Sequence, residues 1–299
     1  MTFEAGSLSQ QDVEKARGHG AILPSPMASI VHIKPSSGWV PLDVRELWEY
    51  RELLSFLAWR DVKVRYKQTV LGLAWALVKP LSIVFTFSIV FGWLARIPSD
   101  NIPYPLFSLC AVLPWQLFAH TLTGTSQSLV ADQNLVTKAY FPRLVIPLSA
   151  IASGLVDFIV AAGTLAGLMA YFHVMPTLFV LTMPLFVLLG ITTALGVGLW
   201  CAALNVRYRD VGHALPFVTQ VWFFATPIAY PSSLIPESWR VWYGLNPMAS
   251  VVEGIRWALL GSESLSLGML LTSLAVALSV LVTGLYYFRR MEQTFADVV

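Results

Sequence analysis

Charged residues are scarce in this chain of 299 residues, because Asp, Glu, Lys and Arg together make up only 12% of it. Soluble domains carry about 25% charged residues. By contrast, 56% of this sequence is hydrophobic, and its mean hydropathy is +0.66. The shortage of charge excludes an ordinary soluble domain and predicts an all-α integral membrane protein. The formal net charge of +2 is too small to indicate a nucleic-acid partner.

Cysteine is nearly absent, and the motifs of common metal and catalytic sites are missing. Cys110 and Cys201 lie far apart within apolar segments and form no CxxC or Cys/His cluster, so neither a disulfide framework nor a metal site is expected. No Ser/His/Asp set or carboxylate pair has the spacing of a hydrolase or transferase, so no catalytic residue is predicted. The motif GxxxxGK[ST] is missing too, so ATP-driven work would need a separate subunit that binds ATP and Mg²⁺.

The first 69 residues are predicted to lie outside the membrane core. Residues 1–36 are polar and lack the basic-then-apolar pattern of a signal peptide, which predicts a flexible cytoplasmic tail. Residues 37–69 are predicted to form an amphipathic, basic helix at the membrane interface. Its apolar stripe consists of Leu47, Tyr50, Leu54 and Leu57.

A basic cluster ends this interface segment. Its cations are Arg60, Lys63, Arg65 and Lys67. Asp61 and Arg65 are spaced i, i+4 with the acid first, which predicts a local ion pair. The simplest interpretation is that these cations keep this end of the first span on the cytoplasmic side. The alternative is that they also bind a partner or an anionic lipid.

Six apolar segments between residues 70 and 288 predict six membrane-spanning helices. They cover about residues 71–95, 105–128, 144–171, 178–204, 214–230 and 267–288. In the first, Lys79 can extend toward the cytoplasm and Pro80 would kink the helix. The fourth is rich in glycine, which permits close helix packing. Its glycines include Gly190, Gly196 and Gly198.

The segment between the fifth and sixth spans is too long and too apolar for a plain turn. Residues 239–243 and 248–260 predict two short helices that re-enter the membrane from the outside, where protein or water must satisfy their backbone groups. Lysine and arginine are concentrated in the tail, the basic cluster and the loops on the same side. The positive-inside rule therefore places both termini in the cytoplasm, with residues 289–299 as a second tail.

Polar and aromatic residues are mixed in residues 131–143, between the second and third spans. This stretch is the candidate docking surface for a separate ATPase subunit, and the alternative is an ordinary amphipathic connector. The candidate docking residues are Asp132, Asn134, Lys138, Tyr140, Phe141 and Arg143.

Aromatic side chains are numerous in the predicted outer half of the spans. Sugar rings pack well on aromatic rings, so these residues are candidates for a polysaccharide path. The alternative is the aromatic belt found at membrane interfaces. The candidates are Trp115, Phe118, Trp222, Phe223, Phe224 and Tyr230.

Asp157 falls in the middle of the third span, where a charged side chain costs about 2.5–3.5 kcal/mol on insertion scales. One interpretation is a proton relay in a secondary transporter. The other is a structural bond to Ser, Thr or Asn on a neighbouring helix, which the lack of further ionisable groups favours.

Several blocks of sequence, in a fixed order, resemble the ABC-2-type permeases that export polysaccharides such as O-antigen, capsule and teichoic acid. The similarity is closest to the O-antigen branch and extends from about residue 37 to the carboxyl terminus. The blocks are WRDVKVRYKQTVLGLAW (59–75), TKAYFPRLVIPLS (137–149), LNVRYRDV (204–211), ATPIAYP (225–231), YGLNPM (243–248) and YFRRMEQTFADVV (287–299).

The resemblance implies a bacterial inner-membrane homodimer of six-span subunits that pairs with two ATPase subunits. It implies a channel for polysaccharide linked to an undecaprenyl diphosphate lipid. By the same likeness, residues 39–67 form the interface helix, 131–143 the coupling helix and 239–260 the re-entrant helices. The basic cluster is then expected near the lipid diphosphate.

Three rival functions stay open at this point. The first is an ABC-2 exporter of a small hydrophobic molecule. The second is a proton-coupled transporter that uses Asp157. The third is a membrane-embedded transferase, which the lack of a catalytic cluster disfavours.

Overall fold

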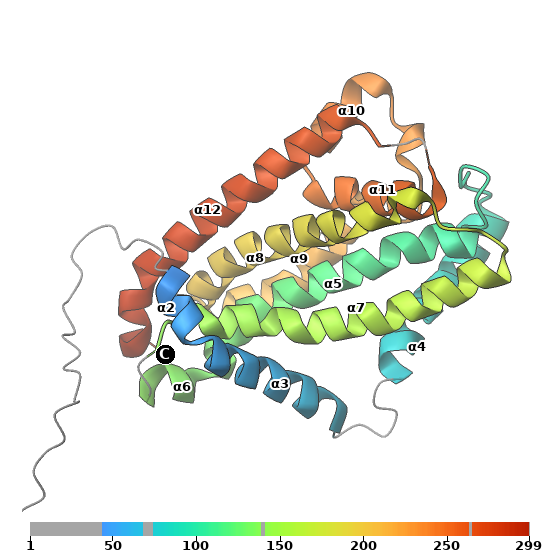
Figure 1. Ribbon diagram of the computed structural model, residues 1–299. Helices are drawn as coiled ribbons and strands as arrows, with labels where there is room; N and C mark the ends of the chain where they lie inside the picture. The colour runs from blue at the N-terminus through green and yellow to red at the C-terminus, as the bar shows by residue number, and fades with distance from the viewer. Residues whose placement is uncertain (1–43, 68–73, 139–140, 263–264, 299) are drawn as a thin grey trace, which may run out of the picture. The chain divides into compact units, whose positions relative to one another are not determined.

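Every regular element is a helix within the residues that the computed structural model describes, which are 44–67, 74–138, 141–262 and 265–298 (Figure 1). Four helices are long: α5 (Tyr104–Ala131), α7 (Val145–Tyr171), α8 (Met183–Arg207) and α12 (Leu267–Val298). The shorter α-helices are α2 (Val44–Glu49), α3 (Arg51–Lys67), α4 (Ala74–Phe87), α6 (Gln133–Lys138), α9 (Asp210–Ala225), α10 (Glu237–Tyr243) and α11 (Pro247–Leu260). A π-helical segment, η1 (Ser88–Leu94), continues α4, and 3₁₀ segments are η2 (Leu178–Thr182) and η3 (Ser232–Leu234).

Helix α5 is the central element of the unit that follows residue 40. It contacts α4, α7, α8, α9 and α11. Its apolar residues are therefore buried around most of its circumference, including Leu106, Leu109 and Phe118, each 0% exposed. A helix that is apolar all round is stable only when other elements cover it. The helices that surround α5 supply that cover.

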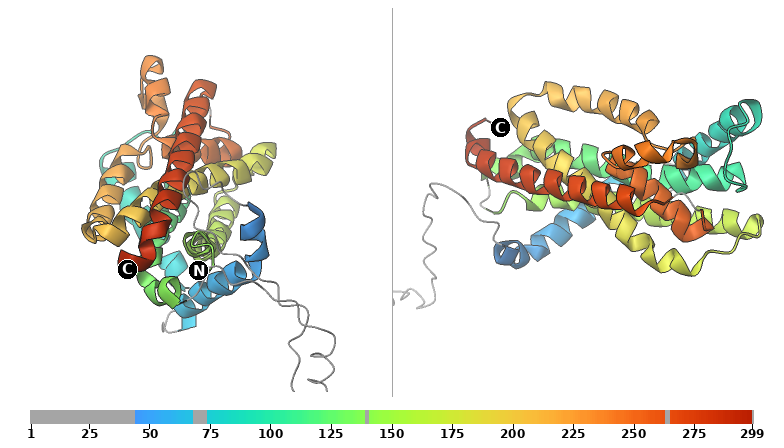
Figure 2. Two further views of the ribbon diagram at one scale, coloured as in Figure 1. Left: turned by 90° about the vertical axis from the view of Figure 1, so that its left-hand side faces the viewer. Right: turned by 90° about the horizontal axis from the view of Figure 1, so that it is seen from above.

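Helix α8 packs closely on two neighbours because glycine replaces larger side chains at the contacts. A Cβ atom on Gly196 would lie 2.7 Å from the backbone nitrogen of Leu281 in α12, and one on Gly198 would lie 2.7 Å from a carbon of Thr125 in α5. Both distances are too short for a real Cβ contact. The close packing predicted for this glycine-rich segment is confirmed, and Figure 2 shows α12 running beside α8.

Five helical segments among the described residues are long and apolar enough to cross a membrane. They are Ala74–Leu94, Tyr104–Ala131, Val145–Tyr171, Leu178–Arg207 and Leu267–Glu292. These match five of the six predicted spans. The remaining prediction, residues 214–230, corresponds to α9, which has 16 residues. At a rise of about 1.5 Å per residue α9 is about 24 Å long, shorter than the ~30 Å hydrocarbon core.

The predicted interface helix is divided at Tyr50 into α2 and α3. Its apolar stripe does face inward: Leu57 is 1% exposed, and Leu47 and Leu54 pack on the same buried cluster. The stripe is covered by protein, since α3 lies along α7 (Figure 1). The exposed apolar face of α3 carries Phe56 and Trp59, each 65% exposed.

The carboxyl-terminal segment continues a helix beyond the last predicted span. Helix α12 extends to Val298. Phe295 is 0% exposed, and its ring lies 5.3 Å from that of Phe288 in an edge-to-face contact. The part of residues 289–299 that the structure describes therefore belongs to the packed domain.

A buried ion pair fixes α11 against the centre of the fold. Arg256 and Glu253 are 0% exposed, and Arg256 Nη1 lies 3.1 Å from Glu253 Oε1. The guanidinium also donates to the carbonyls of Pro227 (2.7 Å) and Ile228 (2.8 Å), and it stacks 3.5 Å from the ring centroid of Phe107. One side chain thus holds together α11, α5 and the segment after α9.

Candidate functional site

A cavity of about 930 Å³ lies among the end of α3 and helices α4, α5, α7 and α9. Its wall combines cationic, anionic and aromatic side chains that are distant in sequence. Arg65, Lys79 and Asp157 supply the charges. The aromatic wall includes Trp75, Trp115, Phe223 and Phe224. This combination suits a ligand that has both an anionic group and a large surface for ring packing.

Asp157, the carboxylate in the middle of α7, is neutralised by α3. Its Oδ2 lies 2.9 Å from Arg65 Nη2, and its Oδ1 accepts a hydrogen bond from the hydroxyl of Tyr66. Burial and the bond to Asp157 raise the pKa of Tyr66 to about 12, so the hydroxyl keeps its proton and donates. The predicted Ser, Thr or Asn partners are wrong, because an arginine and a tyrosine of α3 occupy both oxygens.

His120 of α5 is the second partner of Arg65. Its Nε2 contacts Arg65 Nη1. Arginine only donates, so Nε2 accepts and the ring proton lies on Nδ1. Nδ1 is buried with no hydrogen-bond partner among the described residues, and it faces Gly154, where an added Cβ atom would lie 3.0 Å away. Arg65 therefore connects α3 with both α5 and α7.

Arg60 is the first cation of the basic cluster, and its partners are two carboxylates. Its guanidinium donates to both oxygens of Asp132, at 2.8 and 2.7 Å, and to Asp61 at 2.8 Å. The bond to Asp132 is the main cause that raises the pKa of Arg60. Asp61 also accepts from Ser149 of α7 at 3.2 Å. The predicted Asp61–Arg65 pair is wrong, because each charge has a closer partner.

Lys63 and Lys67 are exposed, and neither forms an ion pair with any residue that the structure describes. Of the four predicted cations, only Arg65 lines the cavity. The cluster is thus divided: Arg60 and Arg65 attach α3 to the protein, while the two lysines face outward. The face that Lys63 and Lys67 share is the part of the cluster available to an external anion.

The predicted docking stretch is partly buried. Asn134 and Lys138 are exposed on α6, whereas Phe141 is only 7% exposed. The surface role expected for Phe141 is therefore corrected, since it packs in a buried cluster with Leu57 and Phe288. Tyr140 lies outside the described residues.

The two remaining docking candidates are held by other side chains. Asp132 is bound by Arg60. The backbone N–H of Arg143 donates to Glu292 Oε1 at 3.0 Å, and its guanidinium contacts the Glu292 carbonyl. Both residues fix α6 and its flanks to α3 and α12, which leaves Asn134 and Lys138 to face outward.

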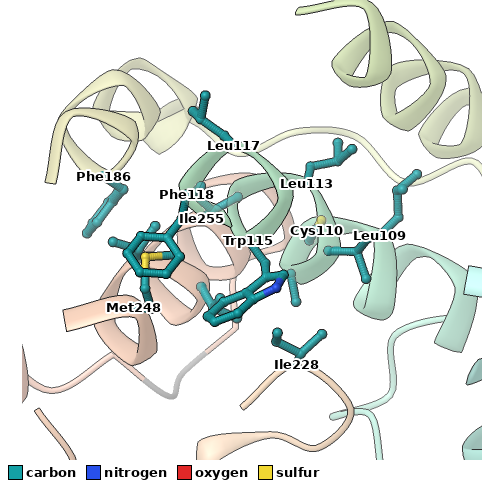
Figure 3. Close-up of a cluster of buried hydrophobic side chains, with 14 of the residues drawn as sticks. Leu109, Cys110, Leu113, Trp115, Leu117, Phe118, Phe186, Ile228, Met248 and Ile255 are labelled. Atoms are coloured by element: carbon teal, nitrogen blue, oxygen red, sulfur yellow. The ribbon is translucent and has the colours of Figure 1, made fainter. Parts of the chain in front are cut away.

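The predicted aromatic path divides into two groups. Trp115, Phe223 and Phe224 line the cavity, whereas Phe118 is buried behind them. The rings nevertheless form one series: Trp115 lies 5.5 Å from Phe223 and 5.1 Å from Phe118, and Phe118 lies 4.9 Å from Trp222. Figure 3 shows where the α5 residues Trp115 and Phe118 meet Met248 and Ile255 of α11.

The other two aromatic candidates make polar contacts away from the cavity wall. Trp222 donates its indole N–H to Asn246 Oδ1 at 2.8 Å. The hydroxyls of Tyr230 and Tyr243 lie 2.6 Å apart. These contacts tie α9 and the segment after it to α10 and the start of α11.

Most residues of the cavity wall were not among the predicted site residues, and those with polar, charged or indole side chains near the Arg65–Asp157 pair include Tyr66, Trp75, Lys79 and His120. Lys79 is exposed on α4 and has no ion-pair partner among the described residues. The signal that marks Lys79 and His120 is the presence of a polar side chain inside an apolar span. Trp75 and Tyr66 carry no comparable signal.

Comparison with known proteins gives a consistent result. The family model described as "ABC-2 type transporter" matches residues 52–260. An O-antigen export system permease protein RfbA of Myxococcus xanthus is 31% identical over 259 residues, covering 86% of this chain and 98% of the relative. A protein of the same name from Klebsiella pneumoniae is 29% identical, covering 83% and 95%. The polysialic acid transport protein KpsM of Escherichia coli is 26% identical, covering 78% and 91%.

Proposed function

Because this chain belongs to the ABC-2 type transporter family, we propose that it is the permease subunit of an exporter of lipid-linked polysaccharide in the bacterial inner membrane. The names of its relatives support a polysaccharide substrate. The observation that carries the proposal is the cavity, which joins Arg65 and Lys79 to an aromatic wall. The cations suit the diphosphate of an undecaprenyl carrier, and the rings suit the sugars.

The active unit in this proposal is a homodimer with six spans in each subunit and two ATPase subunits. Helix α9 is the fifth span in chain order, completed by the segment that follows Ala225, and it brings the number of spans to six. Helices α10 and α11 form the re-entrant outer pair. Buried Glu253 and Arg256 support this role for α11, because a charged pair at membrane depth needs protein around it. Both termini then lie in the cytoplasm, in agreement with the lysine and arginine distribution.

The ATPase subunit is proposed to dock on α6. Asn134 and Lys138 are exposed there. Asp132, between α5 and α6, is bound by Arg60 through two hydrogen bonds, so a force applied to α6 passes directly to α3. The hydrolysis of ATP takes place on the partner, and this chain supplies the path.

The proton-coupled alternative has less support than it had from the sequence. Asp157 is paired with Arg65 at 2.9 Å and accepts from Tyr66. Both carboxylate oxygens are therefore engaged by α3, as expected for a residue that attaches one helix to another.

The function is tested in a strain that lacks the native gene and carries a plasmid copy. The double variant Lys63→Glu/Lys67→Glu is expected to abolish surface polysaccharide, measured by immunoblot, while lipid-linked glycan accumulates inside. Dimer and ATPase assembly, measured by co-purification, is expected to persist because neither lysine has an ion pair with a described residue. The matched control is Arg45→Glu, a charge reversal at a side chain that is 89% exposed.

Two results decide against the proposal. Surface polysaccharide that is unchanged by deletion of the gene contradicts export of polysaccharide by this protein. Export that is unchanged in the double variant contradicts a role for the outward lysines.

A further inference from the structure

Arg65 is held at the cavity wall by other side chains of the protein. It has an ion pair with Asp157 at 2.9 Å and a contact with His120. Yet both members of the ion pair are accessible, since the side chains of Arg65 and Asp157 are 33% and 24% exposed. A half-buried pair at the wall of a cavity can exchange its partner for a ligand without unfolding of the surrounding helices.

The charges that line the cavity do not balance. Arg65 and Lys79 contribute two positive charges, Asp157 contributes one negative charge, and Tyr66 stays neutral. A diphosphate that links a lipid to a sugar carries two negative charges. It satisfies both cations only if Arg65 leaves Asp157. If Arg65 stays paired with Asp157, only Lys79 among the charged residues that line the cavity is available to the ligand, and its second negative charge has no cationic partner there.

We propose that Asp157 is an exchangeable counter-ion, which holds Arg65 before the lipid arrives and releases it to the diphosphate of the entering lipid. This inference rests on the proposed function. Asp157 is a positioning residue, because it acts on the ligand only through Arg65. A ligand with one negative charge pairs with Lys79 alone and gains nothing from displacing Asp157. The competition for Arg65 therefore favours ligands with two negative charges.

Asp157 retains a partner after the exchange. The hydroxyl of Tyr66 donates to Oδ1, whereas Arg65 binds Oδ2. The two partners therefore use different oxygens, so the departure of Arg65 leaves the carboxylate hydrogen-bonded and open to water from the cavity.

The test is a binding measurement on the complete permease–ATPase complex in nanodiscs. The probe is radiolabelled farnesyl diphosphate with N-acetylglucosamine on its terminal phosphate, because a diphosphate substituted at both ends carries two negative charges. Asp157→Asn removes the competing charge and keeps an oxygen for Tyr66. It is expected to tighten binding by up to about fivefold, the scale of one partly exposed ion pair. Arg65→Gln is expected to weaken binding and to remove the gain when combined with Asp157→Asn. The matched control Asp210→Asn removes an exposed carboxylate that lies outside the cavity and is expected to change nothing.

The outcomes separate this inference from the proposed function. Wild-type protein that fails to bind the probe, together with unchanged export in the deletion strain, contradicts the proposed function. Wild-type binding with equal or weaker binding by folded Asp157→Asn overturns the counter-ion alone. Inorganic pyrophosphate that binds as tightly as the probe overturns the lipid as the source of the diphosphate.

A charge-swapped variant covers the case in which Asp157→Asn fails to fold. Arg65→Asp/Asp157→Arg keeps the ion pair and places its cation on α7. If the pair is exchangeable, this variant is expected to bind the probe within about tenfold of the wild type. A complete loss of binding by the folded swap overturns the proposal.

Discussion

Replacing Arg256 by methionine is expected to destabilise the protein more than any surface substitution. The side chain is fully buried and makes an ion pair with Glu253, hydrogen bonds to the Pro227 and Ile228 carbonyls, and a stacking contact with Phe107. Removal leaves the Glu253 carboxylate buried without its cation. Breaking a buried pair in this way costs about 3–5 kcal/mol.

The expected loss is measurable as a thermal shift. A change of 1 kcal/mol shifts the midpoint by roughly 2–4 °C for a domain of 150–250 residues, so Arg256→Met is expected to lower it by about 6 °C or more. The assay is fluorescence-detected size-exclusion chromatography of heated, detergent-solubilised protein. The control is Arg240→Met, because Arg240 is bound by a hydrogen bond of 3.2 Å to the Ile235 carbonyl rather than by a buried ion pair among the described residues. Its cost is expected to be about 1 kcal/mol.

A second variant separates charge from packing. Glu253→Gln/Arg256→Met removes both charges, so it is expected to recover part of the stability that Arg256→Met loses. The backbone N–H of Ser232, which donates to Glu253 Oε1 at 3.1 Å, keeps an acceptor in the glutamine. A midpoint of Arg256→Met within about 2 °C of the wild type would refute the reasoning, since it would show that the buried charge needs no partner.

Three further outcomes are expected. Gly196→Ala places a methyl group against the α12 backbone and should cost about 1–3 kcal/mol. Gly163→Ala should cost far less, because its added methyl group would have no atom of another described element within 4 Å, and equal melting shifts would contradict close α8–α12 packing. Asp132→Asn should lower polysaccharide export per ATP hydrolysed, measured in proteoliposomes, because it weakens the bond to Arg60, and an unchanged ratio would exclude that link from coupling. Lys138→Glu should weaken co-purification of the ATPase. If the variant retains as much ATPase as the wild type at both low and high salt, the partner does not contact this charge.

Much of the fold could be predicted from the sequence, because apolar segments and helix breakers are local signals. Five predicted spans coincide with helices, and the glycines of the fourth mark its close contacts with α5 and α12. The limit of the local signal is visible in α9. Its apolar pattern continues past Ala225, but Pro227 removes a backbone donor, and the chain leaves the helix at Thr226.

The partners of the charged residues could not be predicted, because they depend on tertiary contacts. Local spacing favoured Asp61 for Arg65, yet that arginine bonds to Asp157, which is far away in the sequence. An i, i+4 pair on a helix surface contributes only about 0.3–0.5 kcal/mol. A charge placed in a partly buried carboxylate–cation contact gains more, so the tertiary partner prevails.

Helix α3 joins the two parts of the candidate site, because its two arginines bond to different helices. Arg60 binds Asp132 beside the exposed face of α6, and Arg65 binds Asp157 at the cavity. The two arginines are five residues apart, so they lie about 7.5 Å apart along the helix axis. A short rigid helix held at both points transmits a displacement of α6 to Arg65 with little loss. The leucines of α3 pack the helix on α7, and this packing fixes Arg65 beside Asp157. A helix bound only to the membrane surface would not be fixed relative to α7.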